Sequence, residues 1–196
     1  MVYFVIIFLS MALISVFGII LVAPIIKFSA IKIVLTVVIL TIIEILINAF
    51  FATVIRRCLP KKWFSTDRKV FIAKKTERKF YEKIGIKRWK DKVLELGVFT
   101  NFHKNKIAKP NDNEYIERYI LEANYGVLIH AIMLPLSFLI LIFGNLKLGL
   151  FFTLPIAIVS VFLNLLPLFI LRYNLPKLHA LYRMNKVKNE KSKNLP

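Results

Sequence analysis

AIKIVLTVVILTIIEILINAFFATVI, residues 30–55, is a run of apolar side chains with only two charged groups, Lys32 near its start and Glu44 in its middle. A helix crosses a bilayer with about 20 mostly apolar residues, so this run is long enough to span one. Three further runs of similar character occupy residues 2–26, 126–143 and 146–171. With 58% hydrophobic residues gathered in such blocks, the chain is predicted to be an all-α integral membrane protein with about four transmembrane helices.

The runs divide the chain into four parts. Two N-terminal transmembrane helices occupy residues 1–55, and two C-terminal ones occupy residues 126–171. Between them, residues 56–125 interleave apolar and aromatic side chains with Lys and Arg, a composition typical of helices that lie in the membrane interface. A solvated basic loop is the alternative. Residues 172–196 form a basic tail that is expected to be partly disordered.

Positive charge is concentrated on one predicted side of the membrane. Of the 29 Lys and Arg residues, 19 lie in residues 56–125 and 7 lie from Arg172 onward, whereas 3 flank the short turns on the opposite side. Because basic loops stay in the cytoplasm, both termini and the central segment are predicted to be cytoplasmic in a multi-pass protein of the cell membrane. The net charge of +18 is expected to attract anionic phospholipids and phosphate-bearing substrates to that face.

Several function classes have no support in the residues. The aromatic side chains lie in or beside the apolar runs and no nucleic-acid-binding motif is present, so nucleic acid is not an expected partner. The sequence has no cluster of metal ligands, no glycine-rich phosphate loop and no nucleophile elbow, so neither a metal nor a resident cofactor is expected. The single cysteine, Cys58, is interpreted as an ordinary thiol. His103 and His179 lie in basic surroundings and are expected at the surface.

Ionisable and amide side chains within the membrane helices are the first candidates for a site, because burying them in a bilayer is costly. Glu122 and His130 are eight residues apart on the third helix, and Asn164 and Arg172 are eight apart on the fourth. Eight residues climb about 12 Å along a helix. Since the two helices run in opposite directions, we expect Glu122 level with Arg172, as an ion pair, and His130 level with Asn164, in a cleft open to the cytoplasm.

The inner pair has two interpretations. A neutral imidazole at His130 can act as a general base toward a hydroxyl group, with Asn164 orienting it or donating to an oxyanion. Alternatively, His130 and Asn164 are interhelical hydrogen-bond partners with a structural role. Glu44 has a similar pair of interpretations, since it either faces the same cleft or pairs with a basic side chain.

Three stretches carry a resemblance to a known family. NLLPLFILRYNLPKL, residues 164–178, is similar to the C-terminal signature of the glycosyl-4,4'-diaponeurosporenoate acyltransferase family. RWKDK, residues 88–92, resembles the family's Trp-Lys motif, and Glu122 followed eight residues later by His130 matches its Glu and His. The order is the same from about Leu59 to Arg183. The chain departs from the family's common residues, and so leaves the acceptor open, at Val127, Leu171, Leu175 and Lys177.

The resemblance implies a membrane-bound acyltransferase. Its family moves an acyl group to the sugar of a glycosylated carotenoid, the last step of staphyloxanthin synthesis, so the expected acceptor is such a glycolipid and the expected donor and co-substrate is acyl-CoA. The expected catalytic residues are His130, Glu122 and Asn164. The expected substrate-binding residues are Arg88, Trp89, Lys90, Lys92, Arg172, Tyr173 and Asn174. A non-catalytic assembly or lipid-binding protein, or another lipid-modifying group transfer, is the alternative.

Overall fold

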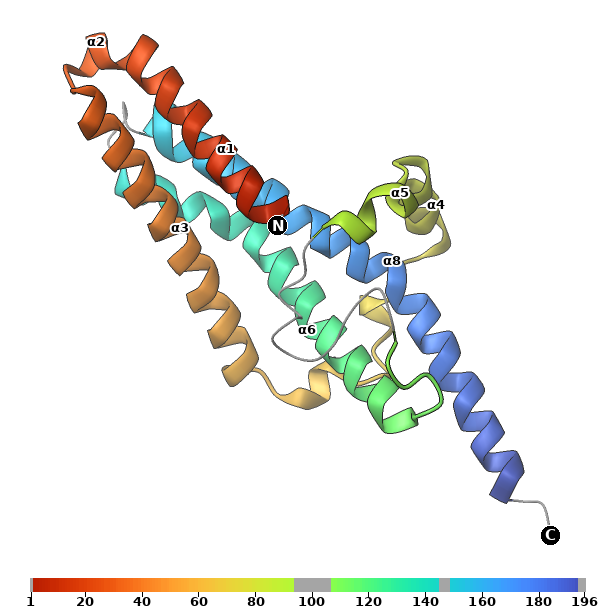
Figure 1. The fold of residues 1–196 in the computed structure, drawn as a ribbon. Helices are drawn as coiled ribbons and strands as arrows, with labels where there is room; N and C mark the ends of the chain where they lie inside the picture. Colours follow the sequence, from red (N-terminus) through yellow and green to blue (C-terminus); the bar gives the residue numbers. More distant parts are fainter. Residues whose placement is uncertain (1, 94–106, 145–148, 194–196) are drawn as a thin grey trace. The chain divides into compact units, whose positions relative to one another are not determined.

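Helices make up the regular structure of the residues that the computed structural model describes, which are all except 1, 94–106, 145–148 and 194–196 (Figure 1). Four helical stretches are long and apolar enough to cross a membrane: Tyr3–Ile26, Ala30–Cys58, Asn113–Phe143 and Phe151–Glu190. The predicted fold class, an all-α chain with four potential membrane spans, is therefore confirmed. The chain is a multi-pass membrane protein.

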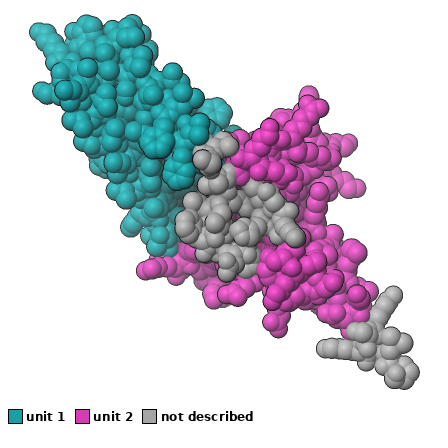
Figure 2. Space-filling model, in the orientation of Figure 1, with its two compact units in different colours: residues 1–55, 130–165 teal, residues 56–129, 166–196 magenta. Residues whose placement is uncertain are grey.

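The chain divides into two compact units, which are shown in different colours in Figure 2. Unit 1 comprises residues 1–55 and 130–165, and unit 2 comprises residues 56–129 and 166–196. In unit 1, a left-handed turn at Lys27, with φ of 56°, separates the first two helical stretches. The elements that contribute to unit 1 are α1 (Val2–Phe17), η1 (Gly18–Val22), α2 (Ala23–Ile26), α3 (Ala30–Cys58), α6 (Asn113–Leu136), η6 (Ser137–Phe143), η7 (Gly149–Thr153) and α8 (Leu154–Lys193).

The core of unit 1 is built from apolar side chains of its helices, and a glycine sets how closely they pack. A β-carbon at Gly18 would lie 2.7 Å from the Phe152 ring and 2.9 Å from Ile33 Cγ2, so a larger residue would force these buried side chains to shift. On the outside, α1 and α3 expose large apolar side chains, as surfaces in contact with lipid do. The buried core residues are Val22, Ile33, Val37, Leu40, Ile140, Phe152, Ile156 and Ala157.

Unit 2 contains short helices joined by tight turns. Its core includes Phe64, whose ring stacks on Tyr125 with centroids 3.8 Å apart and on Phe71 with centroids 5.8 Å apart. Asn124 secures this arrangement, since its Nδ2 donates to the Phe64 carbonyl at 2.8 Å. Gly85 has φ of +70° at the junction of two helices, a conformation that favours glycine. Besides the end of α3 and parts of α6 and α8, unit 2 contains η2 (Lys61–Phe64), η3 (Lys69–Phe71), α4 (Lys75–Lys83), α5 (Ile86–Trp89) and η4 (Lys90–Lys92).

Helix α8 is longer than the sequence predicts. It continues through Pro167 and Pro176 to Lys193, so the described residues of the predicted tail are helical rather than disordered. The reason is tertiary packing: Leu175 and Leu178 are buried, and Asn185 Nδ2 donates to the Pro110 carbonyl at 2.6 Å. The position of α4 and α5 in a membrane interface stays a prediction.

Candidate active site

His130 and Asn164 come together in unit 1. The His130 Nδ1 atom, on α6, lies 3.0 Å from the Asn164 Oδ1 atom, on α8. His130 is half-buried and Asn164 is buried. Helix arithmetic placed these two residues at one level, and the structure places them within hydrogen-bond distance.

The orientation of the Asn164 amide follows from its other contacts. Its Nδ2 atom donates to the backbone carbonyl of Ser160 at 3.0 Å and to Asn48 Oδ1 at 3.0 Å. A backbone carbonyl only accepts, so nitrogen must face Ser160 and oxygen must face His130. The hydrogen between His130 and Asn164 therefore belongs to Nδ1, which leaves Nε2 of the neutral ring with a lone pair. Because both hydrogens of Nδ2 are engaged, Asn164 suits the orienting role better than that of an oxyanion donor.

A polar cluster surrounds this pair in unit 1. Glu44 is buried, and its Oε1 accepts from Asn48 Nδ2 at 2.8 Å, one turn along α3. Ser160 Oγ lies 2.8 Å from Ser137 Oγ, which donates to the Met133 carbonyl at 2.8 Å. Among the described residues Glu44 forms no ion pair with a basic side chain, so that interpretation is not supported, and whether it faces a cleft stays a prediction. We call Glu44, Asn48, His130, Ser137, Ser160 and Asn164 the unit 1 polar cluster.

The predicted ion pair between Glu122 and Arg172 is wrong, because among the described residues each pairs elsewhere within unit 2. Glu122 Oε2 lies 2.6 Å from Arg56 Nη2, and Arg172 binds Glu77. The prediction considered only the third and fourth helices. Arg56 lies in the last turn of α3 and Glu77 lies on α4, and helix spacing carries no information about where those segments pack.

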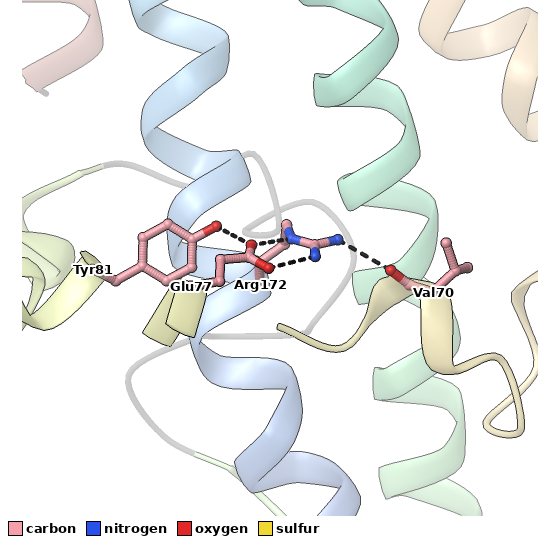
Figure 3. A network of polar contacts seen from close by, with 4 residues as sticks. All are labelled: Val70, Glu77, Tyr81 and Arg172. Carbon is pink, nitrogen blue, oxygen red and sulfur yellow. Dashed lines mark hydrogen bonds and ion pairs between the residues drawn. The ribbon is translucent and has the colours of Figure 1, made fainter. Parts of the chain in front are cut away.

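Figure 3 shows the network around Arg172. The guanidinium binds both carboxylate oxygens of Glu77, with Nη2 and Oε2 2.7 Å apart, and Nη1 donates to the Val70 carbonyl at 3.2 Å. The hydroxyl of Tyr81 also donates to Glu77. The hydrogen bonds from Arg172 hold the pKa of Glu77 below its ordinary value, although partial burial acts the other way. Burial, followed by the Glu77 carboxylate, raises the pKa of Tyr81, which keeps its hydroxyl protonated as a donor.

The other predicted substrate-binding residues all lie in unit 2 and differ in their exposure and contacts. Arg88 and Lys92 are exposed cations. Trp89 and Tyr173 instead have contacts within the unit: Trp89 Nε1 donates to the Ile84 carbonyl at 3.2 Å, and the buried Tyr173 hydroxyl lies 3.4 Å from Glu82 Oε1. Lys90 lies 3.7 Å from Asp91, and Asn174 is half-buried.

His179 is a second correction, since it is buried rather than at the surface. Its exposed fraction is 4%, and its Nε2 has no hydrogen-bond partner among the described residues. The signal was present in the sequence: Leu175, Leu178 and His179 have the spacing of one helix face, and that face packs into unit 2. His103 lies outside the described residues.

Sequence reasoning also missed Asn48. It lies four residues after Glu44 on α3, so the two share one face of a helix within an apolar run. Asn48 could have been identified from the sequence, because a second polar residue four positions after Glu44 is unusual inside a membrane helix.

A family model described as glycosyl-4,4'-diaponeurosporenoate acyltransferase matches residues 60–184. The chain belongs to this family. The match confirms the resemblance seen in the sequence and links the chain to acyltransferases of staphyloxanthin-type carotenoid biosynthesis. No curated protein and no solved structure matches the chain. The matched residues of this acyltransferase family member include His130 and Asn164 but not Glu44 and Asn48, which precede them.

Proposed function

We propose that this chain transfers a fatty acyl group to a hydroxyl of a glycosylated carotenoid or a similar glycolipid, with His130 as the general base. The family match supports the reaction class. The observation that carries the role of His130 is its hydrogen bond to Asn164, which orients the ring through Nδ1 and leaves Nε2 for a substrate hydroxyl. Asn164 positions the base, and Glu122 pairs with Arg56 within unit 2.

The proposed reaction moves one proton and exchanges one bond. The sugar hydroxyl gives its proton to His130 Nε2 while its oxygen bonds to the carbonyl carbon of the acyl thioester. The tetrahedral intermediate then collapses, the carbon–sulfur bond breaks, and the departing thiolate takes the proton from the imidazolium. The products are the acylated glycolipid and the free thiol of the carrier, and His130 returns to its starting state.

Acyl-CoA is the donor that we propose, on grounds of charge. Its phosphates carry negative charge, and the chain has a net charge of +18 with exposed cations at Arg88 and Lys92. Arg172 is a weaker candidate for a phosphate ligand, because a phosphate there has to compete with Glu77. A donor used in the cytoplasm also requires the basic segments to lie on that side, as the asymmetry of Lys and Arg predicts.

Exposed apolar side chains of unit 2 suggest anionic phospholipids as its partners. Trp63, Val70 and Phe80 are 50%, 71% and 49% exposed, and each is next to a Lys in the chain. Exposed apolar side chains interleaved with cations are typical of a surface that rests on an anionic leaflet.

Mass spectrometry of lipid extracts tests the acyl transfer. Cells that make the wild-type chain should contain a glycolipid heavier by one fatty-acyl unit, which cells without the chain and cells with His130→Ala lack. Thr41→Val is a matched control in α3, because the Thr41 hydroxyl bonds only the Val37 carbonyl among the described residues, at 2.8 Å. This control should keep full acylation.

The competing interpretation is that the unit 1 polar cluster only holds helices together. It predicts that His130→Ala lowers the melting temperature of the purified protein but leaves acylation intact wherever the variant is present in the membrane. Full acylation by a stably inserted His130→Ala protein therefore contradicts the role of His130. If no lipid differs between the wild type and cells without the chain, the acyltransferase proposal fails.

A further inference from the structure

Glu44 and Asn48 connect α3 to the proposed catalytic pair, although both lie before the residues that the family model matches. Asn48 Oδ1 accepts from Asn164 Nδ2 at 3.0 Å, and Asn48 Nδ2 donates to Glu44 Oε1 at 2.8 Å. Glu44 is 4% exposed in the middle of an apolar helix. Burying a carboxyl group there is costly, so a use for it is expected.

The orientation of the Asn48 amide is determined in the same way as that of Asn164. Its Nδ2 atom lies 2.9 Å from the backbone carbonyl of Glu44, which can only accept. Nitrogen must therefore face Glu44, and oxygen must face Asn164. Two separate backbone carbonyls, those of Ser160 and Glu44, thus determine the orientations of the Asn164 and Asn48 side-chain amides.

With both amides oriented, the three hydrogen bonds that lead from His130 to Glu44 run in one direction. His130 Nδ1 donates to Asn164, Asn164 donates to Asn48, and Asn48 donates to the carboxyl group of Glu44. Hydrogen bonds aligned in this way polarise one another, and they do so more strongly in an apolar surrounding than in water. At His130, the expected result is a ring whose Nδ1 hydrogen is held and whose Nε2 lone pair is the better acceptor of a proton.

We propose that Glu44 and Asn48 are positioning residues of the active site, which hold His130 in the Nδ1–H tautomer through Asn164. The effect of these two residues on catalysis rests on the proposed function, whereas their effect on the imidazole does not. The series of hydrogen bonds from His130 to Glu44 holds the Nδ1 hydrogen in place and transfers no proton. The reason is that the two amide groups between His130 and Glu44 are neither acids nor bases near neutral pH. The series provides the orientation that a carboxylate bonded directly to the histidine provides in a catalytic triad.

Nitrogen NMR of the protein labelled with ¹⁵N at histidine tests the tautomer without any substrate. The chain has 3 His residues, and loss of a signal in His130→Gln assigns that of His130. In the wild type, Nδ1 of His130 should be protonated and Nε2 should not. Asn48→Leu and Glu44→Leu should each raise the fraction of the other tautomer, and Glu44→Gln, which keeps an acceptor for Asn48, should restore the wild-type spectrum. Thr41→Val on the same helix should change nothing.

A wild-type spectrum with the hydrogen on Nε2 overturns the proposal. Spectra of Asn48→Leu and Glu44→Leu that equal the wild-type spectrum also overturn it, because the ring is then held by Asn164 alone. Folding of the variants is checked by thermal unfolding of the purified protein, because Glu44 and Asn48 lie in unit 1 and the signal of His179 reports on unit 2.

Steady-state kinetics measures the catalytic consequence. Asn48→Leu should lower kcat by about 10-fold and leave the KM of the glycolipid unchanged, because one aligned hydrogen bond is lost and the substrate contacts are not. Glu44→Leu should lower kcat in the same way, and Glu44→Gln, which keeps an acceptor for Asn48, should retain most of the wild-type kcat. If the wild type has no acyltransferase activity, the proposed function fails. The NMR result still decides whether Glu44 and Asn48 hold the tautomer of His130.

Discussion

Arg172 on α8 and Glu77 on α4 are joined by two hydrogen bonds in parallel, with Nη2 and Oε2 2.7 Å apart. A planar guanidinium matches a carboxylate in this geometry, so the contact fixes orientation as well as distance. Both side chains are partly buried, with exposed fractions of 22% and 25%. The pair therefore ties α4 to α8 within unit 2.

Glu77→Gln is expected to destabilise unit 2 by about 2 kcal/mol at pH 7, because it removes charge-assisted hydrogen bonds. The pKa of Glu77 is lowered, chiefly by Arg172, so the pair contributes stability at pH values above the unfolded pKa of Glu, about 4.3. This contribution is lost as the pH falls through the lower, folded pKa. Thermal unfolding at a series of pH values should show a gap between wild type and variant that is full at pH 7 and closes in acid.

Glu82→Gln is the control for this pH series. Glu82 is an exposed acid of the same helix, 3.4 Å from Lys87, and exposed pairs contribute little. Gln at this position keeps an oxygen that can accept from the Tyr173 hydroxyl. A gap for Glu77→Gln that persists unchanged in acid contradicts the assigned role of the Arg172 pair.

Gly18→Ala is expected to destabilise unit 1 by about 2 kcal/mol, because the added methyl group meets the Phe152 ring at 2.7 Å and a packed core resists such an addition. Gly149→Ala is the matched control. The nearest atom to its added methyl group is Thr153 Oγ1 at 3.9 Å, an ordinary contact. Thermal unfolding in detergent compares the two, and an equal effect at both positions is inconsistent with a close helix contact at Gly18.

Cys58 offers a direct measurement of orientation, since it is the single cysteine of the chain and is exposed. If the basic segment is cytoplasmic, a membrane-impermeant maleimide should label Cys58 only after the cells are permeabilised. In a Cys58→Ser background, Lys27→Cys, in the turn between the first two spans, should be labelled in intact cells. The opposite labelling pattern reverses the predicted orientation.

Trp63 reports on the proposed lipid surface, because it is 50% exposed and the chain has only 2 Trp residues. In Trp89→Phe protein reconstituted into vesicles, the fluorescence of Trp63 should be quenched by lipids brominated near the headgroup, as expected for an aromatic side chain at the interface. Trp63→Phe protein, which retains Trp89, shows how strongly the same lipids quench the other Trp residue. Emission of Trp63 that brominated lipids leave unchanged indicates a solvated loop instead.

Local properties of the sequence were enough to predict the membrane spans and one contact of the site. Long apolar runs between residues 2 and 171 have no stable alternative to a membrane helix or a buried one, so the four potential spans were predictable. The contact between His130 and Asn164 followed from the rise of two antiparallel helices, which depends on residue spacing alone.

The tertiary structure decided which polar groups meet. Glu122 and Arg172 are bonded to Arg56 and Glu77, and Asn48 reaches Asn164 from a helix more than a hundred residues earlier in the chain. A helical repeat states which side of a helix a residue occupies, whereas the partner on that side depends on how all the helices pack. For that reason the sequence by itself determined the helices and the levels of their polar groups, and only the packed fold decided the hydrogen bonds that orient His130.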